Sequence, residues 1–115
     1  MVDHHSKRGG KPEINIVASE HVALASLKGR IDIDSSPAVR DQLIALLLAP
    51  HPRTVSIDLS DVTHIDSSGV ATLIEALKIA RNCETELRLQ GLHDRLQRLF
   101  EPTGILSLFN EGIPR

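Results

Sequence analysis

The segment Thr54–Arg81 constrains the fold more than any other stretch, because its hydrophobic period changes within it. Residues 54–59 alternate apolar and polar side chains, which predicts a strand ending at the turn-forming pair Ser60–Asp61. Further along, the apolar residues follow the helical period and predict one buried stripe: Val70, Leu73, Ile74, Leu77 and Ala80. A strand joined by an acidic turn to an amphipathic helix is therefore the predicted centre of the domain.

Three polar residues, Asp66, Ser67 and Ser68, lie where this helix must begin. Short side-chain oxygens can accept hydrogen bonds from the free N–H groups of a first helical turn, and the helix dipole favours negative charge there. Helix capping alone would account for these residue types. The same placement also holds a serine hydroxyl at a helix start, which makes this turn the first place to look for function.

Composition narrows the class of protein. With 115 residues, 41% of them apolar, the chain is predicted to be one globular domain with one core. Its two aromatic residues, Phe100 and Phe109, provide no base-stacking platform, and a net charge of -2 disfavours nucleic-acid binding. A single cysteine, Cys83, and the absence of a long apolar run predict a cytoplasmic protein without direct membrane insertion.

Residues 1–12 are polar and lack an apolar period, so we expect a mobile tail there and a domain over 13–115. The adjacent His4 and His5 have no carboxylate or thiol at ligand spacing and do not indicate a metal site. Residues 14–18 and 22–27 predict an antiparallel hairpin, whose second strand ends at Gly29–Asp32.

Two further helices and one strand complete the predicted order. A helix capped by a serine before Pro37 should bury Val39, Leu43, Leu46 and Leu47 and end at Pro50. Residues 86–90 predict a strand. The next helix, about 93–100, should bury Leu92, Leu96, Leu99 and Phe100 and stop at Pro102 and Gly104. Residues 105–109 fit a last strand or a final helical turn.

Strands that alternate with helices indicate an α/β fold with a sheet that is at least partly parallel. We expect a mixed sheet of about four to five strands, with the helices packed mainly on one face because their apolar stripes are narrow.

Motifs of catalysis are missing. Residues 65–69 lack the glycine two positions before either serine that a nucleophile elbow requires, and no Walker A motif is present. The aspartates that could be assembled into a magnesium site are better explained as turn and cap residues: Asp32, Asp34, Asp58, Asp61 and Asp66. We therefore predict a protein that is not an enzyme, with no catalytic residue, metal or cofactor.

Three blocks, Gly29–Asp32, Val62–Val70 and Arg98–Ile105, resemble the signature blocks of the STAS family, which includes the bacterial anti-sigma-factor antagonists. The resemblance covers about residues 14–109 and implies a small STAS-like α/β domain. In such antagonists the serine directly after the aspartate is phosphorylated by an anti-sigma factor that is also a serine kinase. This implies phosphorylation at Ser67, with Ser68 as the second candidate.

The resemblance also implies how such a switch works. The unphosphorylated antagonist binds the kinase and frees the sigma factor, and a serine phosphatase resets the phosphorylated form. The partner-binding residues that follow from the matched blocks are Asp32, Asp34, Ser35, Asp66, Ser67, Ser68 and Gly69.

Two positions depart from the family pattern. Arg30 stands where a glutamate is frequent, and Ala71 stands where a second glycine is frequent. Ala71, together with Leu89–Gly91 and Asp94, resembles STAS subunits of bacterial phospholipid-transport ABC complexes, which bind a transporter ATPase. A constitutive docking subunit of such a complex is therefore the alternative function.

Overall fold

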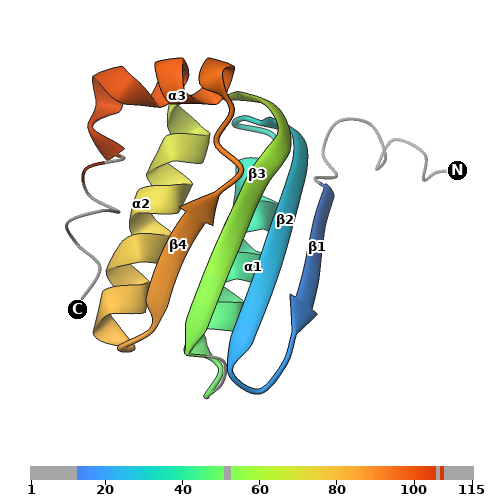
Figure 1. The fold of residues 1–115 in the computed structure, drawn as a ribbon, viewed down its shortest axis with the longest axis vertical. Coiled ribbons are helices and arrows are strands. Elements are labelled where there is room, and N and C mark those ends of the chain that lie inside the picture. Colours follow the sequence, from blue (N-terminus) through green and yellow to red (C-terminus); the bar gives the residue numbers. More distant parts are fainter. Residues whose placement is uncertain (1–12, 51–52, 106, 108–115) are drawn as a thin grey trace, which may run out of the picture.

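The computed structural model describes residues 13–50, 53–105 and 107. Within this part of the chain, four strands form one sheet in the order β1–β2–β3–β4 (Figure 1). Their bounds are Glu13–Ala18 for β1, Val22–Ile31 for β2, Thr54–Ile65 for β3 and Glu86–Gln90 for β4. β1 pairs antiparallel with β2, whereas β2 with β3 and β3 with β4 pair in parallel. The predicted hairpin and mixed sheet are thus confirmed.

The helices of the described chain are α1 (Ser36–Leu48), α2 (Ser67–Asn82) and α3 (Asp94–Phe100), and a short 3-10 turn spans Glu101–Thr103. α1 and α2 lie on the same face of the sheet, and α3 lies at the end where β3 runs into α2 (Figure 1). The Arg40 guanidinium of α1 donates to Glu75 of α2 at 2.7 and 2.8 Å. The prediction of helices mainly on one face is confirmed.

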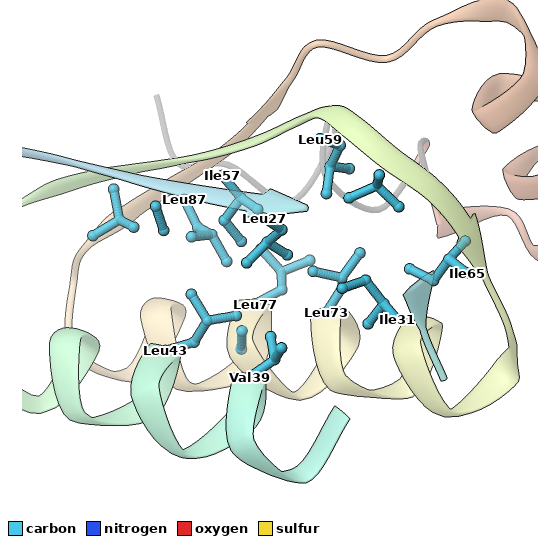
Figure 2. Close-up of a cluster of buried hydrophobic side chains, with 14 of the residues drawn as sticks. Leu27, Ile31, Val39, Leu43, Ile57, Leu59, Ile65, Leu73, Leu77 and Leu87 are labelled. Carbon is cyan, nitrogen blue, oxygen red and sulfur yellow. The ribbon is translucent and has the colours of Figure 1, made fainter. Parts of the chain in front are cut away.

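The core fills the space between the sheet and these two helices (Figure 2). Alternate residues of β2 and β3 face the helices, as period-two strands require. α1 buries Val39, Leu43 and Leu47 as predicted, while Leu46 is only partly buried. α2 buries Gly69, Thr72, Leu73, Ala76, Leu77 and Ala80.

The predicted stripe of α2 is therefore correct for Leu73, Leu77 and Ala80, but Val70 and Ile74 are only partly buried. Thr72 and Ala76 were not expected in the interior. α2 contacts α1 as well as β3 and β4, so its buried arc is wider than one stripe. Small side chains on this arc let the helix approach its neighbours closely.

Strand β3 continues to Ile65, so the predicted end at Ser60–Asp61 is wrong. Two register shifts relative to β2, between Ser26 and Lys28 and between Gly29 and Arg30, absorb the extra residues as bulges. Gly91 packs against the first bulge, where a Cβ would lie 2.7 Å from the Ser60 nitrogen. The bulged extension carries the chain to the far end of the sheet, where Asp66 follows.

The start of α1 and the side of α3 also differ from prediction. α1 begins at Ser36, and its cap residue Ser35 makes no side-chain cap bond. Leu99 is 38% exposed, because the short helix α3 turns only Leu96 and Phe100 into the core. His93 precedes α3 and caps it, its Nδ1 accepting from the Leu96 N–H at 3.3 Å.

Some predictions fall outside the described residues. These are the mobile tail at 1–12 and most of the last element at 105–109. Ile105 is described and is fully buried.

Candidate functional site

Asp66 fixes the start of α2. Its backbone is extended, and its Oδ1 accepts hydrogen bonds from the N–H groups of Ser68 at 2.8 Å and Gly69 at 3.2 Å. The Asp66 N–H donates to the Ile31 carbonyl oxygen at 3.2 Å. The predicted cap is confirmed, and the same residue ties the helix start to the end of β2.

Gly69 is buried in the first turn of α2, against the end of β2. A Cβ at this position would lie 2.9 Å from the Ile31 carbonyl oxygen and 3.0 Å from the Ile31 Cγ2. A backbone carbonyl of a paired strand cannot move aside as the tip of a flexible side chain can. The close packing of α2 on β2 therefore requires a glycine here.

We expect Gly69→Ala to lower the free energy of unfolding by about 1–3 kcal/mol, as overpacking of a core does. Intrinsic helix propensity alone would act in the opposite direction, stabilising by about 1 kcal/mol. Urea denaturation of this variant beside Ala71→Gly, at an exposed position of the same helix, separates the two effects. A Gly69→Ala protein as stable as the wild type would contradict the packing argument.

The two serines differ in accessibility. Ser67, the first residue of α2, is exposed, whereas Ser68, whose N–H donates to the Asp66 carboxylate, is partly buried. A kinase must bring the acceptor hydroxyl to its own phosphate donor, so the exposed serine is the better placed of the two.

The turn between β2 and α1 is braced from within by Ser35. This residue is 3% exposed, and its hydroxyl donates to the Arg30 carbonyl oxygen at 2.9 Å and accepts from the Asp32 N–H at 3.0 Å. The Asp32 Oδ1 accepts from the N–H groups of Asp34 at 3.0 Å and Ser35 at 3.2 Å. Both polar groups are thus occupied in holding the turn.

The Ser35 N–H is the main group that holds the pKa of Asp32 below the ordinary value for an aspartate. Partial desolvation opposes it, and the Asp34 N–H, the Ser35 hydroxyl and the Arg30 guanidinium, 3.6 Å away, assist it. A carboxyl whose pKa is lower in the folded state stabilises the fold above its unfolded pKa, and this contribution disappears as the pH falls through its folded pKa.

We therefore expect Asp32→Asn to lower the denaturation midpoint at neutral pH, and the difference from wild type to shrink below about pH 4. Thermal unfolding of both proteins between neutral and strongly acid pH measures this. A difference that stays constant over the whole range would show that the charge of Asp32 has no part in bracing the turn.

The two turns lie at one end of the sheet, because β2 and β3 are parallel and their carboxyl ends share an edge (Figure 1). Of the seven predicted partner-binding residues, Asp34 and Ser67 are exposed, and Asp32, Asp66 and Ser68 are partly exposed. Ser35 and Gly69 are buried. All seven residues thus lie at one end of the sheet. Five of them are at least partly accessible to a partner, whereas Ser35 and Gly69 support the two turns from within.

One exposed residue of this edge was missed from sequence. Ile33, between Asp32 and Asp34, is 70% exposed. No role was predicted for it from the sequence, although its position between two turn-forming aspartates is typical of an exposed turn.

Three of the five aspartates that could be assembled into a magnesium site accept hydrogen bonds from backbone N–H groups. Asp32, Asp58 and Asp66 each accept N–H groups of the next few residues, which confirms their prediction as turn and cap residues. Over 13–50, 53–105 and 107, no cluster of three or more histidine, cysteine or acidic side chains is arranged to hold a metal ion. No helix in the same ranges combines the length and apolar character needed to cross a bilayer.

One protein family and several known proteins match this chain. The model of the STAS domain matches residues 13–113. An anti-sigma-B factor antagonist of Listeria monocytogenes is 36% identical over 96 residues, which cover 84% of this chain and 82% of the relative.

Solved structures share the fold. SpoIIAA of Bacillus matches in its unphosphorylated form with a TM-score of 0.65, covering 79% of this chain and 82% of that chain at 13% identity. Its phosphorylated form matches with a TM-score of 0.63, covering 84% and 86% at 13% identity. A sulfate transporter family protein from Wolinella succinogenes matches with a TM-score of 0.68, covering 83% and 76% at 24% identity.

At these identities the solved structures support the fold alone, whereas the family model spans almost the whole domain. The matched residues include all three blocks on which the resemblance was based. The chain therefore belongs to the STAS domain family.

Proposed function

We propose that this protein is an anti-sigma-factor antagonist, which binds its partner through the edge around Ser67 and is released by phosphorylation of that serine. The exposed Ser67 hydroxyl at the start of α2, beside the capping carboxylate of Asp66, is the observation that carries the proposal. The Listeria relative, an anti-sigma-B factor antagonist, supports the same function.

The proposed partner is an anti-sigma factor with serine kinase activity. It would transfer the γ-phosphoryl group of ATP to the Ser67 Oγ, with loss of the hydroxyl proton and release of ADP. A serine phosphatase would hydrolyse the ester and restore the hydroxyl. All three proteins would meet in the cytoplasm, and this chain would be the substrate of both enzymes without being an enzyme itself.

The helix start favours a switch that leaves the fold intact. A phosphoserine carries about -1.5 to -2 charges, which the positive end of the helix dipole stabilises. Asp66 already accepts the N–H groups of Ser68 and Gly69, so the phosphate need not displace them from their partner. The phosphorylated and unphosphorylated forms of SpoIIAA both match this chain, which is consistent with a retained fold in that protein.

Phosphorylation would release the partner by changing the surface around Ser67. A phosphate on Ser67, at the edge that also carries the carboxylates of Asp32, Asp34 and Asp66, must lose water in any complex that covers it. A partner surface shaped to a small neutral hydroxyl offers neither the space nor enough donors to compensate for that loss.

The test is phosphate incorporation. After incubation with ATP and anti-sigma serine kinases from the same cell, the wild-type protein should gain the mass of one phosphate. Ser67→Ala should gain none, while Ser68→Ala should behave as the wild type. Peptide mass spectrometry that located the phosphate on Ser68 or Thr63 would contradict the assignment.

Ala71, which is exposed on α2, keeps the transporter function as the second candidate. Recovery of the protein in complex with a membrane transporter ATPase, without phosphate transfer to Ser67 by any kinase tested, would favour that function.

A further inference from the structure

We infer that Ile33 is an apolar anchor of the partner complex, a residue that enters a nonpolar pocket on the anti-sigma kinase. The inference rests on the proposed function and adds the chemistry of the partner's surface. It requires a pocket of apolar side chains with hydrogen-bond donors at its border, facing the carboxylate of Asp34.

Exposure alone would not support this role, since single apolar residues are common on protein surfaces. Ile33 is 70% exposed, compared with 64% for Leu48, 63% for Val17 and 50% for Val22. Its surroundings distinguish it from these residues.

The first distinction is rigidity. The N–H groups of Ser35 and Ser36 both donate to the Asp32 carbonyl oxygen, at 3.1 and 2.8 Å. With the buried Ser35 hydroxyl and the Asp32 carboxylate, these bonds fix the turn on both sides of Ile33. The backbone of a fixed turn loses little conformational freedom on binding. More of the free energy gained by burying an apolar side chain on that turn therefore contributes to affinity.

The second distinction is position. Ile31, two residues before Ile33, accepts the Asp66 N–H and touches the site of Gly69. The turn that carries Ile33 therefore stands beside the helix start that carries Ser67. A partner that covers the Ser67 hydroxyl meets this turn as the next part of the surface.

The third distinction is the polar border. Asp34 is exposed on one side of Ile33, and Asp32 lies on the other with Arg30 at 3.6 Å. An apolar centre with a polar rim is the usual anatomy of a specific protein interface, and a few central residues supply most of its affinity. The edge of this sheet presents that arrangement on a small scale.

The experiment compares Ile33→Ser with Leu48→Ser, measuring the Kd for the anti-sigma kinase that phosphorylates Ser67. Leu48 is similarly exposed but ends α1, so it lies at the opposite end of the helix from the Ile33 turn. We expect Ile33→Ser to unfold at the wild-type temperature and to bind about tenfold to a hundredfold more weakly. Leu48→Ser should bind as the wild type.

Ile33→Ala provides a second variant in case serine alters the turn, and it should show the same loss of affinity. Wild-type affinity in both Ile33 variants, with phosphate still transferred to Ser67, would overturn the inference and leave the proposed function standing. An equal loss in Leu48→Ser would also overturn it. If the wild-type protein neither binds such a kinase nor gains phosphate, the proposed function fails and the inference fails with it.

Discussion

Replacement of Leu73 by alanine is expected to lower the free energy of unfolding by about 2–5 kcal/mol. The side chain is 1% exposed and lies near Ile31 and Ile65 in the core between α2 and the sheet (Figure 2). Removing three carbons there loses the free energy of their burial and leaves a cavity that a close-packed core cannot fill by relaxation. The midpoint of urea denaturation, with the slope of the transition, measures the change.

Leu99→Ala is the matched control, because it removes the same atoms from a residue that is 38% exposed. Its expected effect is well below that of Leu73→Ala, since the exposed part of the side chain gains little from folding. Equal losses in the two variants would mean that burial in the core does not decide their stability. An unchanged midpoint in Leu73→Ala would contradict the assignment of the α2 core face.

Features set by neighbouring residues could be predicted from the sequence. The start of α2 is one, because Asp66 caps N–H groups only two and three residues ahead. The buried face of α1 is another, because the helical period selects Val39, Leu43 and Leu47 without reference to the rest of the chain, although it also selects the partly buried Leu46.

Features that depend on residues distant in the sequence could not be predicted from it. Ser60–Asp61 has the composition of a turn, yet it forms a bulge because β2 continues beside it and Gly91 packs against it. Ser35 and Ser36 are identical in composition, and only the folded turn shows that Ser35 points its hydroxyl back to Arg30. Local sequence propensity allows more than one conformation at each of these positions, and tertiary contacts determine which one forms.

The same distinction between neighbouring and distant residues applies to the candidate site. The matched blocks predicted Gly69 as a partner-binding residue, and the structure shows a packing reason for a glycine at that position. Contact between Gly69 and a partner remains a prediction. No role was predicted for Ile33, whose side chain the folded turn leaves 70% exposed.

Ser67→Asp is expected to fold as the wild type and to bind its partner more than about a hundredfold more weakly, a loss of about 3 kcal/mol. Folding should be retained because an exposed negative charge at a helix start is stabilised by roughly 0.3–1 kcal/mol. Binding should be lost because the carboxylate is larger than the hydroxyl and carries a charge that the complex must desolvate. Thermal unfolding tests whether the fold is retained. The Kd for the kinase, measured on the same preparation, tests whether binding is weakened.

Gln42→Glu controls for the change of charge, because it also makes the protein more negative by one at an exposed position of α1, away from the edge around Ser67. This variant should bind as the wild type if the effect is local. A large loss of stability in Ser67→Asp would instead assign the serine a structural role in the first turn of α2. Wild-type affinity of Ser67→Asp, for the kinase or for a transporter ATPase, would contradict a switch at this residue, since a charge that leaves the complex unchanged cannot release it.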